Sequence, residues 1–330
     1  MTLLRNRNIE VQLIDLTSQN AFEQVKDYDG VMWRYIHTAT GKVKAYKIMQ
    51  TIEKYLKIPV FPNCRTAWHY DDKLIQYYIF KALNIPPPEN WIFYNISQAL
   101  EWLKKTEYPV VFKLSSGASA ENVILVESYR DAKDLAEEMF LYGVFSHTLG
   151  LHKKKHSTVP SLRKMLFATQ YCLRYLHHSM MNLHPRMFSN SGIFEKGFAY
   201  FQEYIPFNEY DTRITVIGNR AFGYRRYNRS NDFRASGSPN RDFNEKDINL
   251  ECVKIAFEAS KKLKAQSMAY DFLNKNGRPV ITEMSYTFVD ILVKKCPGYW
   301  IPDLEFVPKS MWPEEAQIED FVNYIETYRK

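Results

Sequence analysis

The stretch SMAYDFLNKNGRPVITEMSY, residues 267–286, holds two apolar runs on either side of the tetrapeptide NKNG. Asn-Gly between apolar runs is a strong signal for two antiparallel strands joined by a tight turn. Each arm carries one acid, Asp271 and Glu283. Paired strands can bring such carboxylates onto one face, where they suit Mg²⁺, a cation that prefers oxygen ligands and phosphates. Acids on a solvated strand face would give the same pattern, so both interpretations stay open.

The segment before this hairpin predicts more strands and one helix. Consecutive strands with Gly or Asn turns are indicated by FAYFQEYI (198–205), DTRITVIGN (211–219) and RAFGYRRYN (220–228), and a helix by INLECVKIAFEASKKL (248–263). Five arginines lie in this region: Arg213, Arg225, Arg226, Arg229 and Arg234. That density of guanidinium groups near a carboxylate pair indicates a phosphate or carboxylate subsite, with plain surface basicity as the alternative.

A second candidate phosphate site lies in PVVFKLSSGASAENVILV, residues 109–126. A strand ends in Lys113, and a loop of small residues leads into the next strand. Such a loop can offer backbone N–H groups to phosphate oxygens, while the lysine supplies a positive charge. It is not a Walker A motif, because GxxxxGK[ST] and its helix are missing. A simple hairpin without a ligand is the alternative.

The N-terminal third predicts a small α/β unit followed by helices and strands. Strands are expected in VQLIDL (11–16), DGVMWRYIH (29–37) and IPVFPN (58–63), and a helix in KVKAYKIMQTIEKYL (42–56). Further helices are predicted in DDKLIQYYIFKAL (71–83), SQALEWLKKT (97–106) and YRDAKDLAEEMF (129–140), the last with Ser128 as N-cap. The chain is therefore expected to be α+β, with antiparallel sheet in its C-terminal half.

Composition indicates a soluble cytoplasmic protein. Hydrophobic residues make up 45% and charged residues 25% of 330 residues, which is ordinary for a globular protein. We see neither an apolar run long enough to cross a bilayer nor a signal-peptide core, so export is not expected. Cys64, Cys172, Cys252 and Cys296 form no CxxC pair, which argues against a zinc site or a disulfide scaffold and fits a reducing compartment.

Positive charge is concentrated in one segment. Residues 141–200 contain eight Lys or Arg and the single acid Glu195, so this segment alone carries the formal net charge of +7 of the whole chain. Six of the eight histidines lie there too. This segment, rather than the whole protein, is predicted to meet an anionic partner.

The order of these features resembles the ATP-grasp superfamily, in particular the ribosomal-protein glutamate ligases, D-alanine ligases and glutathione synthetases. DDKLIQYYIFKAL with NIPPP (84–88) is similar to the family's DK helix and GIPVP turn, and PVVFK with SSGASAENV to its lysine strand and glycine-rich lid. FQEYIPFNEYDTRITVIGN (201–219) is similar to the hinge, RYNRSNDFR (226–234) to the KR…FR arrangement, and AYDFLNKNGRPVITEMS to the metal hairpin.

The resemblance implies an ATP-grasp fold, with a small N-terminal α/β subdomain and two α+β subdomains that clasp ATP. The expected segments are an N-terminal subdomain (1–71), a central subdomain with the phosphate lid (72–140), a basic helical insertion (141–197) and a C-terminal subdomain with the metal site (198–330). A helix candidate within the insertion, SLRKMLFATQYCLRYLHHSMMNL (161–183), has one apolar stripe. It is a packed structural addition, a dock for an anionic glycan, a lipid-linked substrate or the membrane surface, or, as a third alternative that its scattered histidine spacing disfavours, a histidine metal site.

The resemblance also implies the site residues. The ATP-binding residues would be Lys73, Lys113, Ser115, Ser116, Gly117, Ala118, Ser119, Gln202, Glu203, Tyr204, Ile205, Glu209 and Asp211. The residues that steady the reacting groups would be Arg213, Arg226 and Arg234. The Mg²⁺ ligands would be Asp271, Glu283 and Ser285, where Ser285 replaces the family's asparagine and is a poorer ligand. The family's SSPG substrate loop is missing as well, so the relatives' substrates do not carry over.

The implied function is an ADP-forming carboxylate–amine ligase that uses Mg-ATP and passes through an acyl phosphate. The carboxylate is expected on a small molecule or a glycan, with a surface-polysaccharide precursor as one candidate. An anionic glycan, a lipid-linked acceptor or the inner membrane surface could bind the basic insertion; no nucleic acid is expected. Two alternatives stay open: an ATP-grasp kinase that phosphorylates a hydroxyl, and a nucleotide-binding protein without catalysis.

Overall fold

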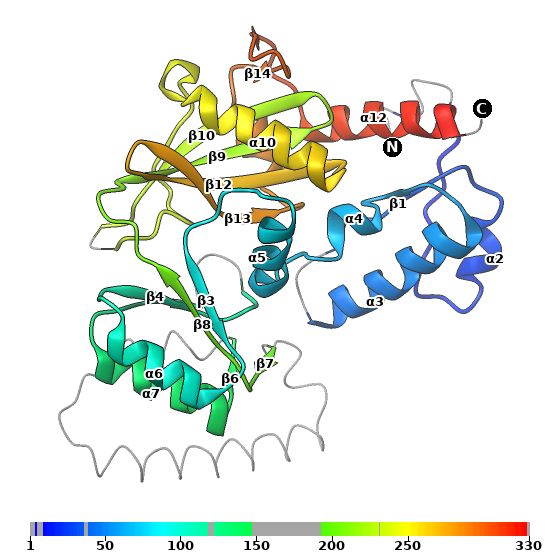
Figure 1. The fold of residues 1–330 in the computed structure, drawn as a ribbon. Helices are drawn as coiled ribbons and strands as arrows, with labels where there is room; N and C mark the ends of the chain where they lie inside the picture. Colours follow the sequence, from blue (N-terminus) through cyan, green and yellow to red (C-terminus); the bar gives the residue numbers. More distant parts are fainter. Residues whose placement is uncertain are drawn as a thin grey trace. The chain divides into compact units, whose positions relative to one another are not determined.

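The computed structural model describes residue 4 and residues 9–35, 39–117, 122–146, 193–230 and 232–328. The chain divides into two compact units (Figure 1). The first unit comprises Met1–Pro88 and Ile205–Lys330, and the second comprises residues 89–204. The four segments predicted from sequence (1–71, 72–140, 141–197 and 198–330) do not coincide with these two units, and that division stays a prediction.

A seven-stranded sheet forms the centre of the first unit. Its strand order is β13-β12-β9-β10-β14-β15, and β11 pairs with β10. The strands are β9 (Tyr210–Ile217), β10 (Arg220–Tyr227), β11 (Arg241–Asp242), β12 (Ser267–Lys275), β13 (Arg278–Ser285), β14 (Tyr299–Trp300) and β15 (Phe306–Val307). All neighbours are antiparallel, as the sequence predicts. Lys275 pairs with Arg278, so Asn276 and Gly277, both with positive φ, form the predicted two-residue turn.

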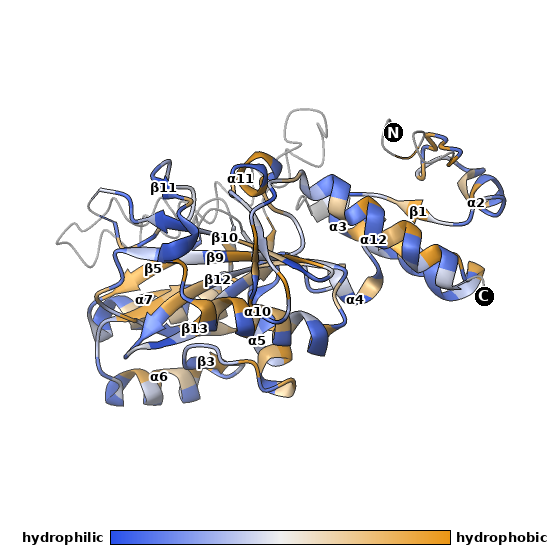
Figure 2. Cartoon of the chain, turned by 90° about the horizontal axis from the view of Figure 1, so that it is seen from above, coloured by the Kyte–Doolittle hydropathy of each residue, from blue (hydrophilic) through white to orange (hydrophobic). Residues whose placement is uncertain are grey.

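Helices cover the two faces of this sheet. On one face, Ile214 and Met268 pack against Val253 and Ala256 of α10 (Leu250–Leu263). On the other face, Ile217, Phe222 and Ala269 pack with residues of α11 (Asp290–Lys294) and α12 (Pro313–Tyr328). Apolar and polar residues alternate along α12 (Figure 2). Successive strand residues face opposite sides, so the odd-numbered residues of β9, including Arg213, face away from α10.

The N-terminal part of the first unit is a small α/β layer. It contains α2 (Ala21–Val25), β1 (Val31–Met32), α3 (Ala39–Thr51), a π-helical turn (Ile52–Leu56), β2 (Val60–Phe61), α4 (Cys64–Ala67) and α5 (Lys73–Ala82). Strands β1 and β2 are parallel. Leu16, Val25, Met49, Ile52 and Val60 form its core. Between β10 and α10 the first unit also has a 3₁₀ turn, Glu245–Asp247.

The second unit is a four-stranded sheet with two helices. Its strand order is β3-β8-β4-β5, and α6 lies beside α7 (Figure 1). The elements are β3 (Asn90–Phe93), α6 (Ile96–Lys105), β4 (Val110–Lys113), β5 (Val123–Val126), α7 (Tyr129–Leu141) and β8 (Ala199–Glu203). The short strands β6 (Val144–Phe145) and β7 (Phe194–Glu195) pair with each other. Ser128 caps α7 as predicted, by accepting from the N–H of Asp131.

One predicted strand is wrong. Residues 11–16 form no strand, and Leu13 is 83% exposed while Leu16 is buried. The only strand that β1 pairs with in the described chain is β2, so this apolar run contributes to the core without a ladder. The helix predicted at 161–183 lies outside the described residues. Among the described residues, we find no helix with the length and apolarity to cross a membrane.

Candidate functional site

Three predicted site residues and Tyr224 form one row across the sheet of the first unit. Glu283 of β13 lies opposite Asp271 of β12, Asp271 lies opposite Arg213 of β9, and Arg213 lies opposite Tyr224 of β10. Directly opposite residues of antiparallel strands share a face. The hairpin register therefore places the two predicted metal ligands and one predicted catalytic arginine side by side, on the face turned away from α10.

Buried ion pairs connect this row to the next one. Arg213 binds Asp271 with two hydrogen bonds, Nε to Oδ1 at 2.6 Å and NH2 to Oδ2 at 2.7 Å. Arg226 lies opposite Asp211 and binds it with two more, at 2.6 and 2.5 Å. NH2 of Arg226 is also 2.8 Å from Oδ2 of Asp271. The result is a chain of alternating charges, Asp211–Arg226–Asp271–Arg213.

Electrostatics keep Asp271 ionised. Burial works to raise the pKa of Asp271, but the charges of Arg213 and Arg226 outweigh it, so the pKa lies below its usual range. The pKa of Arg226 is raised, because the attraction of Asp271 and Asp211 exceeds the effects of burial and of Arg213. A buried charge is tolerated only when it is paired and hydrogen-bonded, and this network meets that condition.

Helix α5 adds a lysine to the row. Asp72 caps α5 by accepting from the N–H of Ile75, and Lys73 is its first residue. One turn later, Gln76 forms two hydrogen bonds with the backbone of Met284 in β13. Its Nε2 donates to the Met284 carbonyl at 2.8 Å, and its Oε1 accepts from the Met284 N–H at 3.1 Å. This clamp fixes α5 against β13. The ammonium group of Lys73, a residue that is 5% exposed, lies 3.7 Å from Oε1 of Glu283.

Three other predicted site residues of the first unit do not belong to the row of Glu283, Asp271 and Arg213. Arg234 binds the carboxylate of Asp232, two residues earlier, with Nε 2.8 Å from Oδ1. The hydroxyl of Ser285 donates to the carbonyl of Thr287 at 2.8 Å, so it supports the turn after β13. Glu209 is exposed, and its carbonyl accepts from the N–H of Asn228. Their predicted roles in catalysis, metal binding and ribose binding stay predictions.

In the second unit, the loop after Lys113 is held by a residue that sequence reasoning missed. Lys113 ends β4 and is 8% exposed. The N–H groups of Ser115 and Ser116 donate to the carboxylate of Glu195, at 2.7 and 2.9 Å. Gly117 has φ +112°, a conformation that favours glycine. Ala118 and Ser119 lie outside the described residues. Glu195 could have been noticed as the single acid of a strongly basic segment.

Strand β8 leads to the predicted hinge. The side chain of Gln202, which is 5% exposed, donates to Oδ1 of Asn90 in β3 at 2.8 Å. The carboxylate of Glu203 accepts from the N–H of Glu89 at 3.1 Å. Tyr204 is half-buried and Ile205 is buried. The side chains of Gln202 and Glu203 thus bind β3 and the residue before it, and the predicted role of residues 202–205 in ATP binding stays a prediction.

The donor set fits a divalent cation that arrives with a nucleotide. Asp211, Asp271 and Glu283 carry three negative charges, and Arg213, Arg226 and Lys73 carry three positive charges, so the set is neutral. The described chain contains no group of three His, Cys, Asp or Glu side chains placed to hold a metal by itself. Mg²⁺ typically takes one or two carboxylates and completes its shell with phosphates and water. Two carboxylates in register on adjacent strands satisfy that requirement.

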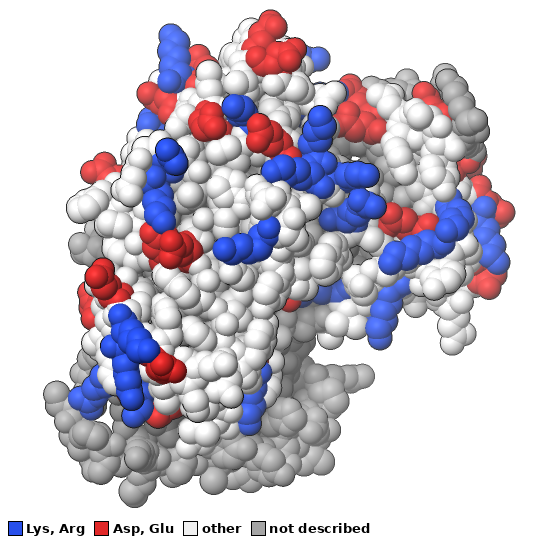
Figure 3. Space-filling model, in the orientation of Figure 1, with Lys and Arg blue, Asp and Glu red and all other residues white. Residues whose placement is uncertain are grey.

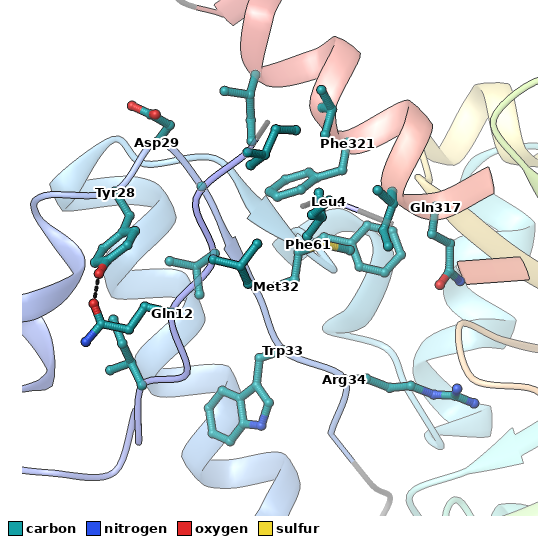
Figure 4. A pocket seen from close by; sticks show the side chains of 18 of the residues that line it. Leu4, Gln12, Tyr28, Asp29, Met32, Trp33, Arg34, Phe61, Gln317 and Phe321 are labelled. Atoms are coloured by element: carbon teal, nitrogen blue, oxygen red, sulfur yellow. Dashed lines mark hydrogen bonds between the residues drawn. The ribbon is translucent and has the colours of Figure 1, made fainter. Parts of the chain in front are cut away.

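The first unit also contains a cavity that none of the predicted site residues line. It has a volume of about 720 Å³ and lies between residues 9–34 and α12. Gln12 and Tyr28 are hydrogen-bonded at one side, and Phe321 of α12 lies at the other (Figure 4). Tyr286 and Phe288, which follow β13, contribute to its wall. Residues just after the β12–β13 hairpin thus line the cavity, but Glu283, Asp271 and Arg213 do not.

The fold is that of the ATP-grasp proteins. A RimK domain ATP-grasp protein from Sphaerobacter thermophilus superposes with a TM-score of 0.53 at 15% identity, covering 98% of this chain and 93% of that one. A D-alanine–D-alanine ligase from Bacillus anthracis, complexed with ATP, gives a TM-score of 0.54 at 14% identity, with coverages of 98% and 91%. The expected fold class is therefore confirmed.

The sequence relatives are named as ligases as well. The α-aminoadipate–LysW ligase LysX of Saccharolobus solfataricus is 30% identical over 88 residues, which are 25% of this chain and 32% of that ligase. The chain therefore matches about a third of the length of this curated relative. No protein-family model matches the chain. The resemblance to ATP-grasp carboxylate–amine ligases is confirmed at the level of fold and partial sequence similarity.

Proposed function

We propose that the protein is an ADP-forming ATP-grasp ligase that joins a carboxylate to an amine with Mg-ATP. The observation that supports it best is the charged row on the ATP-grasp sheet. Asp271 and Glu283 lie in register, and the partly buried Arg213, the buried Arg226 and the buried Lys73 are placed beside them. Such a cluster neutralises phosphate charge and positions reacting groups, which is the main task of a protein in phosphoryl transfer.

The residues of the first unit would divide the work as follows. Asp271 and Glu283 would hold Mg²⁺, which supplies charge neutralisation for the phosphates of the nucleotide. Arg213 and Arg226 would steady the substrate carboxylate and the transferred phosphoryl group, since guanidinium forks match both geometries. Lys73 would contact the nucleotide phosphates. Asp211 would keep Arg226 oriented, because its carboxylate already accepts two hydrogen bonds from that arginine.

The remaining predicted site residues would contribute further contacts to the nucleotide and the metal. We propose that Lys113 neutralises the α- and β-phosphates. The backbone from Gln202 to Ile205 would bind adenine, and Glu209 would accept from the ribose hydroxyls. Arg234 and Ser285 would have supporting parts at the acceptor and the metal. These roles rest on the motif order, and substitution of Lys113 is the direct test of the first.

The reaction would proceed in two balanced steps. A carboxylate oxygen of the acid attacks the γ-phosphorus, the bond from that phosphorus to the bridging oxygen breaks, and ADP leaves with its electron pair. The amine then attacks the carbonyl carbon of the acyl phosphate, and inorganic phosphate leaves as the amine loses a proton. Arg213 and Arg226 would stabilise the negative charge that develops on the oxygens in both steps.

The acid and the amine are proposed by class. D-alanine–D-alanine ligase and α-aminoadipate–LysW ligase are named for amino-acid substrates; those particular substrates do not carry over, and the class we propose here is a small carboxylic acid. We propose that the basic segment 141–200 serves an anionic acceptor or its carrier, such as a polysaccharide precursor or a lipid-linked glycan at a membrane surface. Its +7 charge is the observation that favours this.

Product analysis tests the proposed function. The protein is incubated with Mg-ATP, hydroxylamine and a panel of amino acids, dicarboxylic acids and sugar acids. We expect an acid-dependent release of ADP and phosphate and a trapped hydroxamate, both lost in Glu283→Gln and reduced in Lys113→Ala. AMP and pyrophosphate would show an adenylating enzyme. A phosphoester would show a kinase, and either product would contradict the ligase.

A further inference from the structure

Glu195 fills a set of hydrogen-bond donors that resembles an anion-binding site. Its Oε2 accepts from the N–H of Ser115 at 2.7 Å, and its Oε1 accepts from the N–H of Ser116 at 2.9 Å. The hydroxyl of Ser116 donates to the same Oε1. Glu195 is 6% exposed and Ser116 is 4% exposed. Consecutive backbone N–H groups of this kind bind phosphates in other proteins, but here the ligand is a carboxylate of the chain itself.

The strand that carries Glu195 is fixed in place. Glu195 lies opposite Val144 in the β6–β7 pair, and the N–H of Ser146 donates to the carbonyl of Ile193 at 2.9 Å. On the other side, the N–H of Gly197 donates to the carbonyl of Met139 in α7 at 3.0 Å. These bonds hold both ends of β7 against the second unit. A carboxylate on such a strand suits a fixed anchor better than an arm that swings out for each nucleotide.

The loop has further internal support next to this anchor. The side-chain amide of Asn122 donates to the carbonyl of Ser116 at 2.7 Å, and the N–H of Leu114 donates to the carbonyl of Asn122 at 3.1 Å. A Cβ on Gly117 would lie 2.0 Å from Nδ2 of Asn122, so this position needs glycine. Donors and acceptors of residues 114–116 are thus used to shape the loop, and Gly117 supplies its backbone conformation.

We propose that Glu195 is a positioning residue for the phosphate loop, a role that rests on the proposed function. It holds the N–H groups of Ser115 and Ser116 and thereby sets the direction in which the chain continues after Lys113. The backbone N–H groups of these two serines are then occupied by Glu195, and nucleotide phosphates use Lys113. Glu195, the single acid of the basic segment 141–200, is thus the residue that binds Ser115 and Ser116.

Hydrogen exchange in the nucleotide-free protein tests the anchor directly. In Glu195→Gln, an amide replaces the carboxylate, so one of the two backbone N–H donors, that of Ser115 or that of Ser116, faces an NH2 group in place of an acceptor oxygen, and the hydrogen bonds weaken. We expect the amides of residues 114–117 to exchange at least about tenfold faster than in the unsubstituted protein, since charged hydrogen bonds are worth more than this factor. The control is Glu127→Gln, an exposed acid just after β5 in the same unit.

Nucleotide binding tests the positioning role. We expect Glu195→Gln to weaken Mg-ADP binding by about tenfold, measured by calorimetry, with the control unchanged. Ser116→Ala should weaken binding less, and the double variant should be no weaker than Glu195→Gln, because both act through one contact. Tighter binding in Glu195→Gln would show that the carboxylate competes with phosphate and would overturn the proposal. Unchanged exchange at 114–117 would overturn it too.

Two further outcomes keep the result unambiguous. If Glu195→Gln does not fold, the exchange rates of Ser116→Ala carry the test, with the same expected direction. If the unsubstituted protein binds no nucleotide while Glu195→Gln exchanges faster at 114–117, the proposed function fails and the anchor stands.

Discussion

Arg226 is hydrogen-bonded to two carboxylates at once. It takes both oxygens of Asp211 and reaches Oδ2 of Asp271 at 2.8 Å, while Arg213 binds Asp271 from the other side. Hydrophobic residues of similar volume would often be as stable as such buried pairs, because desolvation offsets most of the attraction. We therefore infer that these charged residues serve a purpose other than stability. Binding of substrate phosphates would be such a purpose. Removing one partner leaves a charge without compensation.

Arg226→Gln should destabilise the first unit strongly. The substitution leaves Asp211 buried beside Asp271 without its guanidinium partner, and breaking a buried pair typically costs about 3–5 kcal/mol. Urea unfolding measures the free-energy change. The control is Arg34→Gln. Arg34 pairs with Asp290, but its side chain is 48% exposed, so we expect the free energy of unfolding to fall by about 1 kcal/mol or less. Equal effects of the two substitutions would contradict the buried network.

His69 predicts a pH dependence of stability. Burial lowers the pKa of His69 to about 4, and within the described residues neither ring nitrogen has a hydrogen-bond partner. Unfolded histidine has a pKa of about 6.5, so the unfolded state binds the proton first. Stability should be full above pH 6.5 and fall as the pH decreases from 6.5 to about 4, by on the order of 3 kcal/mol.

The measurement for His69 is the free energy of unfolding between pH 4 and 7. His69→Phe removes the titrating ring and keeps an aromatic side chain, so its curve should be flatter in this window. A curve that keeps the slope of the unsubstituted protein would show that other groups cause it.

The site residues were predictable from sequence to different extents. Asp271, Glu283 and Arg213 were predicted as candidates from their residue types and motif order, and the strand register brings them together. Asp211 is predicted to bind ATP, and the structure pairs it with Arg226; this pairing was not predicted, because the register that places the two residues opposite each other cannot be read from composition. Glu195 was missed since its contact with Ser116 joins residues 79 positions apart.

At the scale of elements, α5 and β13 form the frame of the site. Gln76 is 2% exposed and binds both backbone groups of Met284 at the free edge of β13. Lys73 lies one turn earlier on the same helix, so its distance from Glu283 depends on this clamp. Burial of a polar side chain without such partners would be costly.

Gln76→Leu should loosen α5 from β13. Leucine keeps most of the volume but leaves the N–H and C=O of Met284 buried without partners, at a cost of about 2–4 kcal/mol. Nucleotide affinity should fall as well, because Lys73 loses its position. Unfolding and calorimetry measure the two effects. Gln98→Leu on α6, at an exposed position, should change neither, and a similar loss in that control would exclude the clamp as the cause.

The basic segment gives a separate prediction for the acceptor. A combined charge-neutralising variant is needed, since exposed charges contribute little one by one; it changes Lys153, Lys154, Lys155, Arg163, Lys164 and Arg174 to Gln. We expect nearly unchanged ATP binding, and weaker binding to vesicles with acidic lipid or to an anionic glycan. Binding of the unsubstituted protein should weaken as salt increases. Equal binding of both proteins at low salt would leave the segment a structural addition.

The elements with strong local signals agree with prediction, and the strand expected at residues 11–16 does not. The Asn-Gly turn, the Ser128 cap and the amphipathic α10 each have a local physical cause, so sequence is sufficient. The strand expected at residues 11–16 depended on a partner strand elsewhere, and strand pairing is a tertiary property. Its apolar residues still enter the core, as the burial of Leu16 shows.

At the scale of the whole molecule, charge and fold point to different tasks for different segments. Outside residues 141–200 the formal charges sum to zero, and acidic and basic side chains are interspersed on the face drawn in Figure 3. The ATP-grasp fold covers 98% of the chain in the superposition with the RimK domain protein. Motif order was sufficient to predict that fold. The substrates could not be predicted, because the family's SSPG substrate loop is missing here and the residues in its place have no counterpart in the family.

The central claim is that the row of Glu283, Asp271 and Arg213 binds nucleotide together with Mg²⁺. Calorimetry with Mg-ATP, with Mg²⁺ alone and with ATP in excess EDTA tests it on the unsubstituted protein and on Glu283→Gln. Glu283 is chosen because its side chain is 34% exposed, so the variant should fold. The control is Glu319→Gln, an acid of α12.

We predict that Mg-ATP binds, that Mg²⁺ alone does not bind to the neutral donor set, and that Glu283→Gln weakens Mg-ATP by at least about tenfold. Mg-ATP affinity that is equal in the unsubstituted protein, Glu283→Gln and Glu319→Gln, or no binding of Mg-ATP by any of them, would contradict the account.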